Sequence, residues 1–116
     1  MSHMTIQQFR TKLKATPTTI TFAETMQVIE DNYNFLPTSF TNGELRNNVG
    51  ENTGSCKIFA FARHQKFTKG ATLFCFGAHY QGVLKDSNGS SHQNIRNFMK
   101  TGFEGLSFDS TAISLK

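Results

Sequence analysis

A chain of 116 residues has room for one domain but not for two. Its 12 Lys and Arg outnumber its 8 Asp and Glu, giving a formal net charge of +4, but the basic residues are scattered. This distribution disfavours nucleic-acid binding and fits a mixed, solvated surface. No apolar run approaches the ~20 residues of a membrane span, so no membrane association is expected.

The first residues, Met1-Ser2-His3-Met4, have the pattern of a cloning remnant, so residues 1–3 are set aside and one domain is expected over 4–116. No signal-peptide pattern opens the chain, which predicts a cytoplasmic, reducing environment. Cys56 and Cys75 are then expected to be free thiols. We expect a monomer whose core is built from Phe side chains, including Phe59, Phe61, Phe76 and Phe98.

The N-terminal third predicts two helices. Thr5 and Gln8 have the spacing of a capping box, and the first helix should end before Pro17. Thr21 and Glu24 form a second capping box. Apolar residues follow each box at helical spacing: Ile6, Phe9 and Leu13, then Phe22, Met26 and Ile29.

Residues 34–54 contain several helix and strand breakers and are expected to be irregular, apart from a short strand at 38–41. The segment 56–62 is ambiguous between a helix and a buried strand. Its two alanines and a potential cap at Ser55 favour a helix.

Thr68 is expected to cap a helix that Gly82 closes, with Leu73, Phe76 and Tyr80 on one face. After a turn at Asn88-Gly89, Ser91 is expected to cap the last helix, which ends at Gly102. The tail over 106–115 alternates loosely and is expected to pair with 38–41. The prediction is a mainly α, single compact domain of about five helices with a minimal β element.

Cys56 is the first candidate for chemistry, because it stands near an expected helix start in Asn52-Thr53-Gly54-Ser55-Cys56-Lys57. The positive end of the helix dipole and Lys57 would lower the thiol pKa and favour a thiolate. The hypothesis is a small cysteine-dependent enzyme in which Cys56 works with His79 or His92. The alternative is that Cys56 is a small, inert core residue, as free cysteines usually are.

The second candidate is the start of the last helix, residues 89–96. Free N–H groups at a helix start attract anions, and His92 and Arg96 lie one turn apart. A small anionic ligand is therefore predicted to contact Ser91, His92, Asn94 and Arg96. In the alternative, Ser91 only caps the helix and Arg96 pairs with a carboxylate.

Metal and cofactor motifs are not recognisable. His64, His79 and His92 are widely spaced, and neither a Cys-x-x-Cys nor a His-Glu-x-x-His pattern is present. The sequence also contains no phosphate-binding loop or dinucleotide fingerprint. We therefore expect no metal and no cofactor.

Four segments together resemble the HopJ type III effector family: Thr38-Ser39-Phe40-Thr41-Asn42-Gly43, then Gly54-Ser55-Cys56-Lys57-Ile58-Phe59-Ala60-Phe61-Ala62, then Cys75-Phe76-Gly77, and His92-Gln93-Asn94-Ile95-Arg96-Asn97-Phe98-Met99. The resemblance runs from about Met4 to Phe108. It implies a bacterial binding or interaction domain, with a protein partner and export by a type III secretion system, but it supplies no catalytic residues. Whether the chain is an enzyme stays open, and the cysteine-enzyme and small-anion hypotheses stand beside the binding domain.

Overall fold

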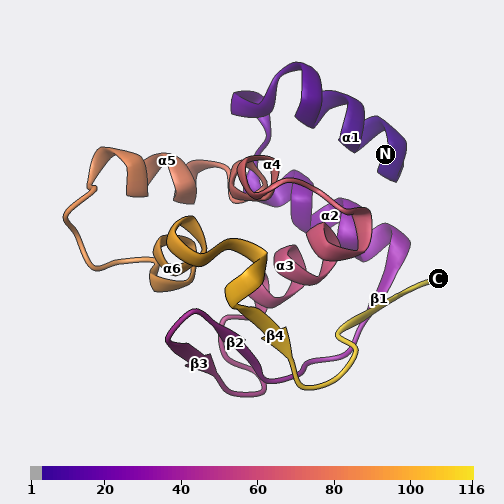
Figure 1. The fold of residues 1–116 in the computed structure, drawn as a ribbon. Coiled ribbons are helices and arrows are strands. Elements are labelled where there is room, and N and C mark those ends of the chain that lie inside the picture. Colours follow the sequence, from indigo (N-terminus) through magenta and orange to yellow (C-terminus); the bar gives the residue numbers. More distant parts are fainter. Residues whose placement is uncertain (1–3) are drawn as a thin grey trace.

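The computed structural model describes residues 4–116, so residues 1–3, the expected cloning remnant, lie outside the described residues. This part of the chain forms six α-helices and five short strands (Figure 1). The helices are α1 (Ile6–Ala15), α2 (Phe22–Asn32), α3 (Thr53–Gln65), α4 (Lys69–Phe74), α5 (Ala78–Lys85) and α6 (Gln93–Thr101). The strands are β1 (Tyr33–Phe35), β2 (Phe40–Asn42), β3 (Leu45–Asn47), β4 (Leu106–Phe108) and β5 (Ile113–Leu115). Two 3-10 turns, Pro17–Thr19 and Gly102–Gly105, follow α1 and α6.

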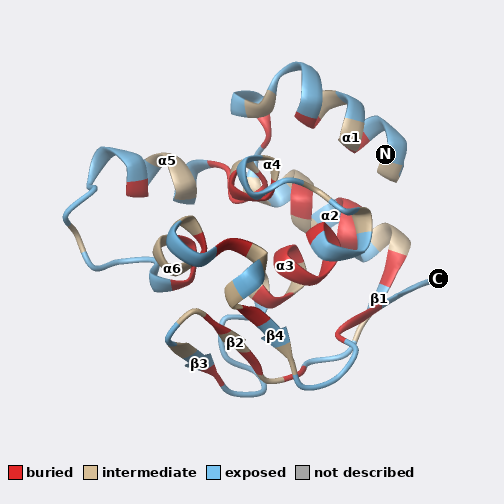
Figure 2. Cartoon of the chain, viewed as in Figure 1, coloured by how far each residue is buried: buried red, intermediate tan, exposed pale blue. Residues whose placement is uncertain are grey.

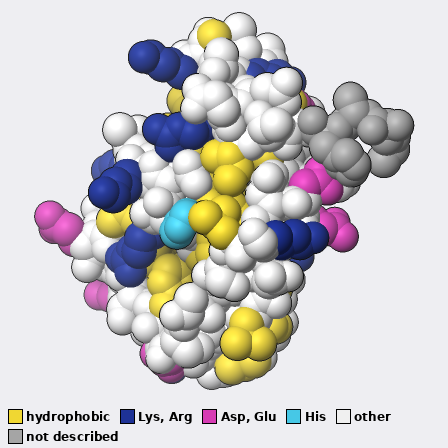
Figure 3. Space-filling view, turned by 90° about the vertical axis from the view of Figure 1, so that its right-hand side faces the viewer, with side chains coloured by type: hydrophobic (Ala, Val, Ile, Leu, Met, Phe, Trp, Pro, Cys, Tyr) yellow, Lys and Arg dark blue, Asp and Glu magenta, His cyan; other side chains and the backbone are white. Residues whose placement is uncertain are grey.

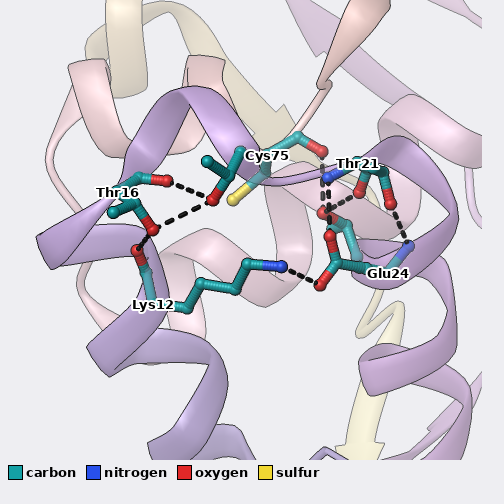
Figure 4. Close-up of polar contacts among 7 residues, drawn as sticks. Lys12, Thr16, Thr21, Glu24 and Cys75 are labelled. Atoms are coloured by element: carbon teal, nitrogen blue, oxygen red, sulfur yellow. Dashed lines mark hydrogen bonds and ion pairs between the residues drawn. The ribbon is translucent and has the colours of Figure 1, made fainter.

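Both predicted capping boxes are present. Thr5 Oγ accepts from Gln8 N at 3.0 Å, and Gln8 Oε1 accepts from Thr5 N at 2.8 Å. At the start of α2, Thr21 and Glu24 make the same reciprocal pair (Figure 4). Lys12 Nζ also donates to Glu24 Oε2 at 2.6 Å, which links α1 to the start of α2. Local sequence therefore determines where the first two helices begin.

The buried face of α2 differs from the predicted stripe. Phe22 and Met26 are only half-buried, and Thr25 is among the residues that take the fully buried positions. The Thr25 hydroxyl donates to the backbone oxygen of Cys75 at 2.8 Å. A polar residue can occupy this interior position because its hydroxyl has a partner there.

The core surrounds α3, and Figure 2 colours much of this helix as buried. The segment 56–62 is helical, as its alanines predicted. The ring of Phe59 lies 5.5 Å from that of Phe76 and 4.8 Å from that of Phe98, measured between centroids. All four predicted core rings, Phe59, Phe61, Phe76 and Phe98, are buried. This confirms a core built from Phe side chains.

The single helix expected from Thr68 to Gly82 is wrong. Thr68 does cap a helix, but the chain turns at Gly77 (φ +58°) and α5 starts after it, so that Gly82 lies inside α5. A Cβ at Gly77 would lie only 2.6 Å from the backbone nitrogen of Phe22. The start of α2 therefore approaches the chain so closely that only glycine fits. This split gives one helix more than predicted.

The β structure is larger than predicted. The tail does pair with the earlier segment: β4 runs antiparallel to β2, with Phe40 opposite Phe108, which confirms this pairing. However, β3 adds a third strand beside β2, and β1 forms a second sheet with β5, with Tyr33 opposite Leu115. The expectation of irregular structure over 34–54 is therefore wrong at β1 and β3, whereas residues 36–39 and 48–52 form neither helix nor strand. Each of these strands is only three residues long, which leaves little periodicity to detect.

The cysteines and the lengths of the helices can also be compared with the predictions. Cys56 and Cys75 are both buried and are not joined to each other, as expected. None of the helices within residues 4–116 is both long and apolar enough to cross a membrane.

Candidate functional site

A cleft of about 480 Å³ opens where three helices begin. The first turns of α3, α5 and α6 all contribute to its wall, and half-buried Phe22 adds an aromatic side. The polar residues of the wall are Asn52, Ser55, His79, His92, Gln93 and Asn94. No Asp, Glu, Lys or Arg is among the described residues that line it, so its electrostatic character comes from helix ends and neutral polar groups.

The helix starts at this cleft have no side-chain caps. Asn52 and His92 are the N-cap residues of α3 and α6, both have left-handed backbone conformations (φ +50° and +52°), and neither side chain bonds to its helix start. Gly77, before α5, offers no side chain at all. The predicted caps Ser55 and Ser91 are therefore wrong, because α3 begins before Ser55 and α6 begins after Ser91. The uncapped first turns of α3 and α6 present N–H groups, whereas in α5 the N–H groups of His79 and Tyr80 already donate to the backbone oxygens of Phe76 and Gly77. All three starts present the positive end of a helix dipole.

His79 and His92, both singled out from the sequence, are brought together at the cleft. The centroids of their rings are 5.0 Å apart, and the His79 ring also meets Phe22 edge-on at 4.8 Å. Both histidines are exposed to solvent. They therefore form an accessible pair of imidazoles beside the uncapped starts of α5 and α6.

A buried group of asparagines holds the start of α6 against the three-stranded sheet. Asn94 Oδ1 accepts from Asn42 Nδ2 and from Asn47 Nδ2, each at 3.1 Å, and Asn94 Nδ2 donates to Asn47 Oδ1 at 2.9 Å. Asn52 Nδ2 also donates to Asn47 Oδ1, at 2.7 Å. The side chain of Asn94, predicted to contact a ligand, thus has its hydrogen bonds within the protein.

Asn42 and Asn47 were not identified from the sequence as part of a site, and Asn52 was included only as the first residue of the segment around Cys56. Asparagine is common in turns, and Asn42-Gly43 has the pattern of a turn. Only the pairing of β2 with β3, and the position of α6 against them, brings these side chains together. Nothing in the local sequence signals that arrangement.

Arg96 lies on the other side of α6 from His92. Its Nε donates to the backbone oxygen of Ser91, its Nη1 donates to that of Ser87 at 3.3 Å, and its Nη2 lies 3.9 Å from Asp86 Oδ2. It lines a separate cleft of about 440 Å³. His92 and Arg96 therefore line different clefts, with His92 at the N-cap of α6 and Arg96 one turn further on.

Cys56 does not belong to the cleft. Its Sγ lies 3.9 Å from the backbone oxygen of Thr38, on the interior side of α3, and the structure brings neither His79 nor His92 to it. Burial raises the pKa of the Cys56 thiol, although the contact with Thr38 lowers it in part. Lys57 Nζ lies 5.0 Å from the centroid of the Phe35 ring. The predicted low-pKa thiolate is therefore wrong, and Cys56 is a core residue.

Within residues 4–116, no three His, Cys, Asp or Glu side chains gather where they could hold a metal ion. His64, the third candidate histidine, lies away from the cleft, and its Nδ1 is 2.8 Å from the hydroxyl of Tyr33. The groups that line the cleft can form hydrogen bonds through backbone N–H groups, the two imidazoles and the side chains of Ser55 and Gln93.

Comparison with known proteins identifies the family of this chain but does not identify an activity. The chain is 50% identical to a protein of unknown function, VPA0580, whose crystal structure matches it with a TM-score of 0.96 over 99% of this chain and 97% of the other. No curated protein matches it significantly. Residues 6–113 match the family described as HopJ type III effector protein. The chain therefore belongs to the HopJ type III effector protein family.

Proposed function

We propose that this domain binds a small anion, a phosphate or carboxylate group, in the cleft at the starts of α3, α5 and α6. The observation that carries the proposal is the meeting of three uncapped helix starts with the His79–His92 pair at a cleft lined by no described acidic residue. In this proposal the anion lies on the His92 side of α6, and not on the Arg96 side.

The energetics favour a weak but specific site. An anion at a helix start gains about 0.3–1 kcal/mol from the dipole, and several starts act on the same group. Backbone N–H groups in fixed positions add hydrogen bonds without a cost in side-chain entropy. Free phosphate should therefore bind with a dissociation constant on the order of 1 mM, and a ligand that also contacts Phe22 should bind more tightly.

The family description supports a second part of the proposal, which concerns where the domain acts. As a member of a type III effector family, the chain is proposed to be exported and to act by binding rather than by catalysis. The raised pKa of buried Cys56 removes the support that the sequence gave to a cysteine-dependent reaction.

NMR titration of the ¹⁵N-labelled chain with sodium phosphate tests the site. The amides of Gly54, Ser55 and Gln93 should shift together and saturate in the millimolar range. Parallel titrations with acetate and with sodium chloride separate carboxylate and phosphate binding from a general effect of salt. If these amides stay still at about 20 mM phosphate, the proposal is wrong.

Variants make the test specific. His92→Asn keeps a residue that tolerates the left-handed backbone, and His79→Gln keeps a helix former. Both should weaken phosphate binding by about threefold or more, since each removes an imidazole donor. His64→Gln is the matched control because His64 lies away from the cleft, and it should leave the affinity unchanged. Equal effects at all three histidines would contradict the assignment.

A further inference from the structure

A second surface, formed by different elements, has the character of a peptide groove. It lies between α1 and the segment 66–71 and encloses about 910 Å³. Half-buried Phe67 and Ala71 provide apolar contact area along it, with buried Leu13 beneath them, and Arg10, Lys14 and Lys66 provide its charges. No Asp or Glu is among the described residues that line it. Figure 3 shows several Lys and Arg side chains beside a band of hydrophobic ones on the face that lies to the right in Figure 1.

Arg10 is fixed in place at this groove. Its Nη1 donates to the backbone oxygen of Gln65 at 2.8 Å and to Gln65 Oε1 at 3.2 Å. Its guanidinium lies over the Phe67 ring, 5.2 Å from the centroid. Within residues 4–116 its Nη2 and Nε make no hydrogen bond, so one edge of a planar, immobilised guanidinium is available. Such an edge matches a carboxylate in two-point geometry.

The other two cations of the groove have no acidic partner among residues 4–116. Neither Lys14 nor Lys66 forms an ion pair with any residue in the described part of the chain, whereas Lys12, two residues before Lys14 on α1, pairs with Glu24 at 2.6 Å. On α1, Lys12 is therefore neutralised by an internal ion pair, whereas Lys14 leaves a positive charge on the surface of the groove. An apolar strip bordered by unpaired positive charge is complementary to a segment that alternates apolar and acidic residues.

We infer that the groove between α1 and residues 66–71 is a docking surface for an acidic, amphipathic peptide segment of a protein partner. Apolar side chains of the segment lie on Phe67 and Ala71, and its carboxylates pair with Arg10, Lys14 and Lys66. This interaction is separate from the proposed small-anion cleft, which the first turns of α3, α5 and α6 form. Nucleic acid fits less well, because the groove offers one half-buried ring, Phe67, for stacking and only three cations.

A titration with defined peptides tests the inference. The probe is a synthetic peptide of about twelve residues that alternates leucine and glutamate pairs, added to the ¹⁵N-labelled full chain. We expect the amides of residues 7–15 and 66–71 to shift and those of the small-anion cleft to stay unmoved. A second peptide with serine in place of leucine should bind about tenfold more weakly, because it keeps the charge and loses the apolar contacts. A single-stranded oligonucleotide of similar charge is the third probe.

Three variants locate the interaction. Lys14→Glu should weaken binding of the leucine–glutamate peptide about three- to tenfold, which is the range for exposed ion pairs that are lost and replaced by repulsion. Lys85→Glu makes the same change in net charge on α5, far from α1 in Figure 1, and should change the affinity less than twofold. Arg10→Lys keeps the charge but loses the planar edge, and should also weaken binding.

Four outcomes would overturn the inference. They are unmoved amides at 7–15 and 66–71, equal binding of the serine peptide, equal effects of Lys14→Glu and Lys85→Glu, and tighter binding of the oligonucleotide than of the peptide. The first outcome leaves the small-anion cleft unaffected, because the phosphate titration reports on different amides.

Discussion

The side-chain amide of Asn42 donates to both the backbone oxygen of Asn94, at 2.7 Å, and its side-chain oxygen, at 3.1 Å. Both residues are buried, so these bonds form away from water and fix the first turn of α6 against β2. The start of α6 is therefore held by a neighbouring strand instead of a cap of its own. N–H groups held in this way need no rearrangement to meet an anion.

Replacing Asn94 tests this anchoring. Asn94→Ala leaves the buried Nδ2 of Asn47 without its acceptor, so the free energy of unfolding should fall by about 1–3 kcal/mol. Urea denaturation followed by circular dichroism measures it. Asn97→Ala on the same helix is the control, since no side-chain hydrogen bond of Asn97 is known within residues 4–116, and it should change stability by less than about 0.5 kcal/mol. Equal losses would show that Asn94 has no anchoring role.

Substituting alanine for each of two glycines, Gly77 and Gly82, should change the stability of the fold in opposite directions. Gly77→Ala places a methyl group 2.6 Å from Phe22 N at a positive φ, so it should destabilise the fold by about 2 kcal/mol or more. Gly82→Ala lies inside α5 with nothing within 4 Å of the new Cβ, and should stabilise by about 0.5–1 kcal/mol. Thermal unfolding of both variants measures the two changes in stability. A stabilised Gly77→Ala variant would contradict the helix break.

These two glycines show what the sequence could reveal about the fold. The caps at Thr5, Thr21 and Thr68 were predictable because each bond joins residues only three apart. The break at Gly77 was not, because its cause is a contact with Phe22, more than fifty residues earlier in the chain. The pairing of Tyr33 with Leu115 has a similar origin. Interactions within one turn of helix leave a sequence pattern, and distant ones do not.

The site was predictable only in part, for the same reason. His79 and His92 stood out as chemically capable side chains, but their contact depends on the packing of α5 against α6. The left-handed N-caps Asn52 and His92 were missed, because a serine near each helix start gave a stronger local signal. Arg96 has the spacing to join His92 on a continuous helix, but the helix begins one residue too late.

The two cysteines should be unreactive in the folded protein. Burial raises the pKa of Cys75 to about 12 and also raises that of Cys56, so neither thiol forms much thiolate at pH 8. Ellman's reagent should show no fast phase with native protein and two thiols per chain in denaturant. The rate with free cysteine under the same conditions is the reference. A native thiol that reacts at that rate would revive the thiolate hypothesis for Cys56.

Asp109 should contribute stability that depends on pH. Hydrogen bonds from Arg46 and Ser39 lower the pKa of this carboxyl from 3.8 to about 2. Because the folded-state pKa lies below the unfolded-state value, the contribution is complete above about pH 4 and is lost as the pH falls towards 2. Asp109→Asn should therefore lower the melting temperature at pH 6 and lose most of that difference at pH 2. A difference independent of pH would contradict this origin.

Phe98 is the most demanding test of the core. Its side chain is fully buried and packs edge-on against the ring of Phe103, at 5.0 Å between centroids. Phe98→Ala should lower the free energy of unfolding by about 3–5 kcal/mol, because a large cavity replaces the ring. Phe98→Leu, which fills most of that space, should cost clearly less. A loss below about 1 kcal/mol for Phe98→Ala, measured by urea denaturation, would show that the site collapses around the cavity.

The pairing of β2 with β4 also affects how the chain is made. Phe40 packs against Phe108, 68 residues further along, with ring centroids 5.7 Å apart. At a synthesis rate of about 5–20 residues per second, Phe40 leaves the ribosome about 3–14 s before its partner. During that interval β2 has an unpaired edge and an uncovered aromatic ring. A nascent chain stalled before residue 106 should therefore bind chaperones more strongly than one stalled in an added C-terminal linker, where residues 106–108 have already left the ribosome.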